Sequence, residues 1–182
     1  MRNKYEKTQE AWIDDGVDVK RRKLSIFTEI DEYEMAKYVR ALDLLESISD
    51  DPIEVNISSF GGCVYSGLAL FSRLVSSPCD ITTIAQGKVM SMGLILFMAG
   101  DDRVCDKYTT LMAHQVSSVT VGKLTDLEVD VTETKRLNDM LMEILGERSD
   151  KPTKWWKQQT KHEDKYYSAE KAKELGVVPD VI

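Results

Sequence analysis

Cysteine is scarce in this sequence. The 182 residues include three cysteines, Cys63, Cys79 and Cys105, an odd number without a Cys-x-x-Cys pair. This count and this spacing exclude a disulfide framework and a cysteine zinc site. The sequence therefore predicts reduced, buried thiols in a cytosolic protein.

Long apolar segments are missing too. Residues 1–7 contain no apolar core of the kind that a secretory signal needs. The longest apolar run, residues 92–99, is far too short to cross a bilayer. We therefore expect a cytoplasmic protein with no membrane contact.

An excess of positive charge is also missing. The chain has 24 basic and 31 acidic side chains, a formal net charge of −7. Its one basic cluster, residues 20–23, is short and lacks interleaved aromatic residues. These features exclude a nucleic-acid-binding protein and favour a solvated entry to a strand at residues 20–23.

What is present is the composition of an ordinary globular protein, with 42% hydrophobic and 30% charged residues. The length fits a single domain over residues 1–182. Strand-like and helix-like periodicities alternate along the chain, which predicts an α/β fold with largely parallel strands. Expected strands lie at 23–30, 53–57, 81–85, 103–106 and 109–113, and expected helices at 31–49, 64–75 and 91–99.

The pattern changes at the two ends of this alternation. Residues 1–19 are polar with little periodicity, which predicts an N-terminal arm. Residues 125–145 are typical of one long helix, whose apolar positions extend further than one small core can cover. Such a helix either projects from the body, packs against another subunit, or folds back on its own subunit.

Ser91 lies between an expected strand and an expected helix. A serine at such a sharp turn exposes its hydroxyl, and the helix N-terminus beside it favours developing negative charge. Gly93 permits close approach of neighbouring backbone. Taken alone, the segment fits a helix N-cap equally well, because serine is a common residue at that position.

Two further side chains complete a candidate site. His114 follows an expected strand and is one of only two histidines, so it is a candidate general base, although a core histidine has the same pattern. Asp164 is a candidate for the carboxylate that orients such a base, although considered singly it has the pattern of a surface charge. The second histidine, His162, lies in a charged run and is the fallback base.

The tandem glycines Gly61 and Gly62 follow a strand. Their N–H groups can face an oxyanion there, or the pair can form a plain turn.

Taken in this order, these segments resemble the ClpP family, the proteolytic subunits of the Clp proteases. Residues 90–93, Met-Ser-Met-Gly, are similar to the family's Ala-Ser-Met-Gly, and residues 112–115, Met-Ala-His-Gln, to its Met-x-His-Gln. Residues 164–169, Asp-Lys-Tyr-Tyr-Ser-Ala, resemble its Asp-Arg-Phe-Leu-Ser-Ala, and residues 58–62 match its Asn-Ser-Pro-Gly-Gly in part. Four motifs in the family's order, from about residue 20 onward, make the resemblance specific.

The resemblance implies a serine endopeptidase that cleaves unfolded proteins or small peptides without a cofactor. Ser91 would be the nucleophile, His114 its general base and Asp164 the residue that orients His114. The backbone N–H groups of Gly62 and Met92 would form the oxyanion hole.

The resemblance also implies how substrate binds and how the chain assembles. Substrate would lie as an added strand between Gly62, Cys63 and Val64 on one side and Val116 and Ser117 on the other. The ClpP/crotonase-like fold would form a head from residues 20–115 and 151–182. A handle at residues 116–150 would join two stacked heptameric rings into a tetradecamer that encloses the active sites.

Three departures from the family pattern bear on these expectations. Phe60 replaces a proline before the glycine pair, and Val116 and Ser117 stand where a proline and an apolar residue usually follow His-Gln. Residues 1–19 differ from the apolar segment that forms the family's axial gate and contacts its ATP-driven AAA+ unfoldase. An unfoldase partner therefore stays open, as does a phage-type protease that acts without one.

Two other functions remain as alternatives. Crotonase-like enzymes share the broad fold and use backbone oxyanion holes on acyl-CoA thioesters, which would make Ser91 incidental. A catalytically silent ring subunit would keep the assembly without the activity. A serine-directed reagent separates both from an active peptidase.

Overall fold

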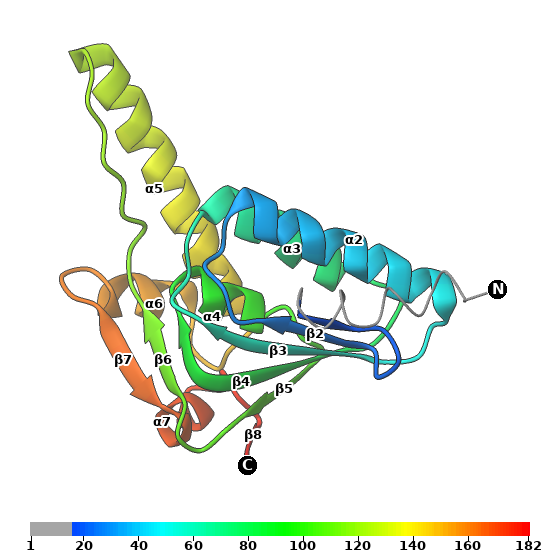
Figure 1. Cartoon of the computed structure of the whole chain (residues 1–182). Helices are drawn as coiled ribbons and strands as arrows, with labels where there is room; N and C mark the ends of the chain where they lie inside the picture. The colour runs from blue at the N-terminus through cyan, green and yellow to red at the C-terminus, as the bar shows by residue number, and fades with distance from the viewer. Residues whose placement is uncertain (1–15) are drawn as a thin grey trace.

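The computed structural model describes residues 16–182, and its centre is an eight-stranded sheet (Figure 1). The strands follow the order β1-β2-β3-β4-β5-β8, and β6 pairs with both β4 and β7. Pairing is antiparallel for β1 with β2 and for β6 with β7, and parallel elsewhere. The strands are β1 (Val17–Asp18), β2 (Lys23–Ile26), β3 (Ile53–Ser59), β4 (Ile81–Met90), β5 (Asp102–Cys105), β6 (Thr110–Ala113), β7 (Lys165–Ser168) and β8 (Asp180–Val181).

The helices alternate with these strands along the chain, so the predicted α/β class with largely parallel strands is confirmed. Residues 16–182 contain α2 (Glu32–Ile48), α3 (Val64–Val75), α4 (Met92–Phe97), α5 (Leu124–Glu147), α6 (Thr153–Gln159) and α7 (Ala169–Glu174). The side chain of Asp31 accepts the N–H of Glu34 at 2.8 Å, which fixes the start of α2. In Figure 1, α2 and α3 lie side by side over the sheet.

The strand β4 divides between two neighbours. Its first part pairs with β5, through Thr82 to Ala85, whereas its last three residues pair with β6. Between these parts lies Gly87, whose φ of +66° is a conformation that side chains with a Cβ rarely adopt. The register with β3 shifts at the same place, from Ile57 opposite Ala85 to Ser59 opposite Val89. The bend directs the end of β4 away from β5 and toward β6.

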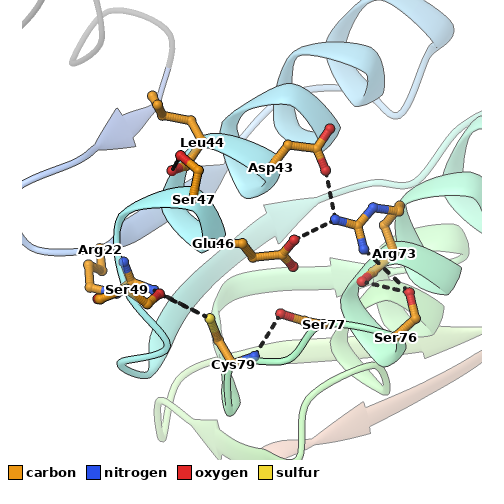
Figure 2. Close-up of polar contacts among 10 residues, drawn as sticks. All are labelled: Arg22, Asp43, Leu44, Glu46, Ser47, Ser49, Arg73, Ser76, Ser77 and Cys79. Atoms are coloured by element: carbon orange, nitrogen blue, oxygen red, sulfur yellow. Dashed lines mark hydrogen bonds and ion pairs between the residues drawn. The ribbon is translucent and has the colours of Figure 1, made fainter.

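Two arginines attach α2 to the rest of the head (Figure 2). Arg73 of α3 donates to Asp43 and Glu46 of α2, each at 2.7 Å. Arg22 donates to the carbonyl oxygens of Leu45 and Ser49, at 2.8 and 3.0 Å, near the C-terminal end of α2. Arg22 belongs to the basic cluster that the sequence placed in solvent, but its guanidinium instead donates to backbone carbonyls at the C-terminal end of α2.

The long helix α5 has two different halves. Its C-terminal half contributes the buried residues Leu137, Leu141, Met142 and Leu145 to the body of the molecule. Its N-terminal half projects from that body, and residues 114–123 run up beside it without forming a strand (Figure 1). The predicted long helix is confirmed, with bounds within two residues of those expected.

The N-terminal arm falls largely outside the described residues, because the structure begins at Gly16. Of the residues expected in it, Val17 is buried and pairs with Leu24 of β2, so the sheet starts earlier than the sequence indicated. Among residues 16–182, none of the helices combines the length and the apolar character that a membrane span requires.

Candidate active site

The ends of three adjacent strands bring Ser91, His114 and Asp164 together. Ser91 follows Met90, the last residue of β4, and Met90 lies opposite Met112 of β6. His114 directly follows β6. Asp164 directly precedes β7, which runs antiparallel to β6 with Lys165 opposite Ala113. Residues that are distant in the sequence therefore meet at one edge of the sheet.

Ser91 sits on a strained turn between β4 and α4. Its φ of 53° lies in the left-handed region that residues with a Cβ rarely adopt. Its N–H donates to the carbonyl of Met112 at 2.9 Å, which holds the turn against β6. The following helix is buried over its whole length, from Met92 to Phe97. The strained backbone of Ser91 is held in place by its hydrogen bond to Met112 and by the buried helix α4. The turn thereby directs the serine hydroxyl away from the helix that follows it.

The base and the nucleophile are in direct contact. The Nε2 atom of His114 lies 2.7 Å from the Oγ atom of Ser91, a hydrogen-bond distance. The Nδ1 atom of His114 lies 3.6 Å from the Oδ1 atom of Asp164. This second distance is that of an ion pair and is longer than an N–H···O hydrogen bond. Asp164 is also the more open of the two, because 53% of its side-chain surface is exposed against 24% for His114.

The two predicted oxyanion donors flank Ser91. Met92 is the first residue of α4, where a backbone N–H has no acceptor within the helix. Gly62 forms a parallel bridge with Ile30, which donates to Gly61 and accepts from Cys63. In such a bridge the N–H of the central residue points to the other side. The Gly62 N–H is therefore directed away from Ile30.

Gly61 packs directly against the nucleophile. A Cβ added to Gly61 would lie 2.7 Å from the Cβ of Ser91 and 3.0 Å from the N atom of Met92. Its φ of +104° is also closed to other residues. The close approach of the glycine turn to the serine turn thus requires a glycine at position 61.

A cavity of about 250 Å³ opens beside Ser91 and His114. Its lining includes four of the five residues predicted to bind substrate, namely Gly62, Val64, Val116 and Ser117. Its apolar walls come from α4, the strand β6 and the buried half of α5, through Leu94, Ile95, Met112, Leu141, Met142 and Leu145. Of these, the α5 residues were not anticipated as part of the site, because helical periodicity marks core positions and cavity walls alike.

Two cysteines are buried as expected, but the third is not. Cys63, which we predicted to contact substrate, is exposed and stands at the N-cap of α3 outside the cavity lining. Hydrogen bonds with Ser66 lower the pKa of its thiol. Burial raises the pKa of Cys105 to about 11, so that thiol stays protonated at neutral pH.

The remaining site predictions are placed as follows. His162 is exposed, in the same charged segment as Asp164. Phe60, at the position of the family's proline, is 70% exposed, and the ammonium of Lys88 lies 4.7 Å from the centre of its ring. Across residues 16–182, no three histidine, cysteine, aspartate or glutamate side chains gather as a metal site would need.

Comparison with known proteins identifies the family of this chain. The family model described as Clp protease matches residues 7–182. The ATP-dependent Clp protease proteolytic subunit of Deinococcus radiodurans is 32% identical over 167 residues, which cover 90% of this chain and 81% of that protein. A mutant of ClpP1 from Listeria monocytogenes has a similar structure, with a TM-score of 0.84 and 25% identity over 90% of this chain and 92% of the other.

These matches decide between the broad alternatives. The structural likeness confirms the predicted ClpP-type fold. The family and its curated relative are proteolytic, which favours a serine-type peptidase over an acyl-CoA enzyme. With the family model matching nearly the whole sequence, the chain belongs to the Clp protease family, and it is a ClpP-type serine peptidase.

Proposed function

We propose that this peptidase cleaves unfolded or small peptide substrates with Ser91, His114 and Asp164 as its catalytic triad. The single observation that carries the proposal is the 2.7 Å contact between His114 Nε2 and Ser91 Oγ. A general base must lie within hydrogen-bond reach of the proton that it removes, and His114 meets that condition.

The chemistry follows from these positions. His114 takes the proton of Ser91 as its oxygen attacks the peptide carbonyl, and the N–H groups of Gly62 and Met92 receive the resulting oxyanion. The protonated His114 then gives its proton to the leaving amine, which leaves an acyl group on Ser91. Water, deprotonated by His114, attacks that ester and releases the acid.

Asp164 would hold the tautomer of His114 and stabilise its charged form. The Oδ1 atom of Asp164 lies 3.6 Å from Nδ1 of His114, and the Asp164 side chain is exposed and so has room to move. We expect this carboxylate to approach His114 more closely in the working enzyme. Catalytic contacts are often loose before substrate binds.

The shape and lining of the cavity favour substrates with an apolar side chain on the residue whose carbonyl Ser91 would attack. Its walls are aliphatic along α4 and α5, and burying a leucine-sized side chain there is worth about 1.5–3 kcal/mol. The rest of the substrate would extend as a strand between the backbone of residues 62–64 and residues 116–117.

We propose further that copies of the chain form stacked heptameric rings around a chamber, with residues 116–150 as the handle between rings. The projecting half of α5 supports this, since its exposed Leu124, Val129 and Val131 would be covered by another subunit. The Deinococcus relative is described as ATP-dependent, and by analogy an AAA+ unfoldase is a candidate partner. A cytoplasmic location and a phage-type origin remain proposals of the same kind.

Labelling with a fluorophosphonate tests the triad. The intact mass of the parent protein is expected to rise by one adduct, and Ser91→Ala is expected to remain unlabelled. Lys88→Ala, directly after the bend of β4 at Gly87, is a control that leaves the serine in place. An assembled parent protein that takes no adduct would overturn the proposal and leave a silent ring subunit as the better description.

A further inference from the structure

The two walls of the proposed substrate groove are connected at a point that catalysis does not use. One wall, residues 62–64, continues directly into α3. The other, residues 116–118, runs beside α5. Tyr65, the second residue of α3, donates its hydroxyl hydrogen to the Oε1 atom of Glu133 in α5 at 2.7 Å. The contact joins the helix that continues one wall to the helix that supports the other.

The second wall depends on α5 for its position. The N–H of Val116 donates to Oδ1 of Asn138 at 3.2 Å. The hydroxyl groups of Ser118 and Thr134 lie 3.2 Å apart. Thr134 is the neighbour of Glu133 in the helix, so the α3–α5 contact lies level with Ser118. A displacement of α5 at Glu133 therefore also displaces the wall at Ser118.

The acceptor in this contact is fixed and charged. Arg136 donates to Oε2 of Glu133 from Nε at 2.7 Å and to Oε1 from Nη2 at 2.6 Å. These hydrogen bonds, with that from Tyr65, lower the pKa of Glu133 to about 2. Tyr65 is 57% exposed, so water competes for both partners and the contact opens readily.

We propose that Tyr65 and Glu133 form a clasp across the acyl side of the substrate groove, and that Tyr65 thereby determines how many substrate residues bind there. This inference rests on the proposed function, because it uses the same groove. An extended peptide advances about 3.3 Å per residue, so the wall from Val116 to Ser118 accommodates only the first few residues before the scissile bond. A longer acyl segment meets the Tyr65–Glu133 contact and has to open it.

Two fluorogenic substrates of different length test the clasp. Both end in leucine on aminomethylcoumarin, which suits the apolar cavity, and they carry two or six residues before the scissile bond. Tyr65→Phe removes only the hydroxyl. We expect it to raise kcat/KM for the six-residue substrate about fivefold through a lower KM, and to leave the two-residue substrate unchanged.

Matched variants separate the clasp from a general structural effect. Tyr108→Phe removes another exposed hydroxyl, from a residue outside the groove, and is expected to change neither substrate. Glu133→Ala should act like Tyr65→Phe, whereas Glu133→Gln keeps an acceptor oxygen and should lie between the parent and Glu133→Ala. Equal changes for both substrates in Tyr65→Phe, or no change, would overturn the proposal.

A second measurement does not depend on peptidase activity. In a Ser91→Ala background, Tyr65→Phe is expected to speed amide hydrogen exchange in residues 116–123 at least threefold. Unchanged exchange there would overturn the clasp even if the parent enzyme is active. If the parent cleaves neither substrate, the proposed function fails, and the exchange result still decides whether the contact holds the wall.

Discussion

The two halves of α5 both carry apolar residues but place them in opposite environments. In the C-terminal half, Leu141 and Leu145 are buried against the head and line the cavity beside Ser91. In the N-terminal half, Val129 and Val131 are 67% and 69% exposed. The comparison teaches that the head covers the apolar residues of the C-terminal half, whereas the N-terminal half presents apolar surface that the described residues of this chain leave uncovered.

The largest effect on kcat/KM is expected from a substitution that disrupts the tight packing beside Ser91 in the head. Gly61→Ala adds a Cβ at 2.7 Å from that of Ser91, on a backbone with a φ of +104°. Misplacement of a nucleophile by about 1 Å costs about a hundredfold, so we expect at least that loss in kcat/KM. Gly122 precedes α5, and in Gly122→Ala the added Cβ meets only the movable side chain of Asp126. This variant should change kcat/KM less than twofold, which corresponds to about 0.4 kcal/mol in activation free energy. Comparable losses in the two variants would contradict the difference between head and handle.

The next largest effect is on the free energy of unfolding, and one substitution in each half of α5 measures it. Leu145→Ala leaves a cavity in the core and should lower the free energy of unfolding by about 2–3 kcal/mol. Val129→Ala should lower it by about 0.5 kcal/mol or less. Urea unfolding at matched protein concentration measures both. If the exposed half joins rings, sedimentation will show weaker association for Val129→Ala, and an unaltered assembly would count against the handle interface.

A smaller effect is expected where the catalytic site reaches the surface. Because Asp164 lies 3.6 Å from His114 and is half exposed, Asp164→Asn should lower kcat by less than the roughly 10⁴-fold that this change costs in a tightly hydrogen-bonded triad, and by far less than Ser91→Ala does. Glu163→Gln is the matched control, since the neighbouring Glu163 pairs with Lys165. A loss as large as that of Ser91→Ala would mean that Asp164 contacts His114 closely throughout catalysis.

The smallest expected effect is an absence of pH dependence in the Tyr65–Glu133 contact. The pKa of Glu133 is lowered to about 2, and the contact with Glu133 raises the pKa of Tyr65 above its ordinary value. Because the pKa of Glu133 is lower in the folded state, its contribution is complete above the unfolded value of 4.5 and is lost as the pH falls toward 2. Exchange in residues 116–123, corrected for the intrinsic rate, should be equal at pH 6 and pH 8. A difference would require another titrating group at the contact.

The sequence predicted the alternating core well, because buried strands and amphipathic helices repeat their apolar residues at fixed spacing. Helix bounds at 64–75 agree with α3, and the beginning of β3 at Ile53 was expected. Periodicity did not reveal β1, β7, β8, α6 or α7. These segments are short and largely polar, so their few apolar residues do not set a period. It also stopped β4 at Ala85, because Gly87 is ordinarily a strand terminator and here is the bend.

The candidate site depended on a different kind of information. Ser91 and His114 follow strands that periodicity detects, and the structure brings their side chains into contact. Asp164 lies in a charged run without any period, so the residues alone made it no more than a candidate, and the family resemblance strengthened it. Its adjacency to His114 arises from the pairing of β7 with β6. The exposure of Cys63 could not be foreseen, because it depends on the turn at Gly61 and Gly62 rather than on the thiol.

The order of the three strand ends along the chain bears on how the enzyme is made. Ser91 leaves the ribosome first and His114 next, while Asp164 arrives only with β7, the partner of β6. A nascent chain that has finished β4 and β6 therefore carries a serine and a histidine without the carboxylate beside them. Under the proposed triad, proteolytic competence would develop late in synthesis, after nearly all of the fold has formed, and a growing chain would have little opportunity to cut its neighbours on a polysome.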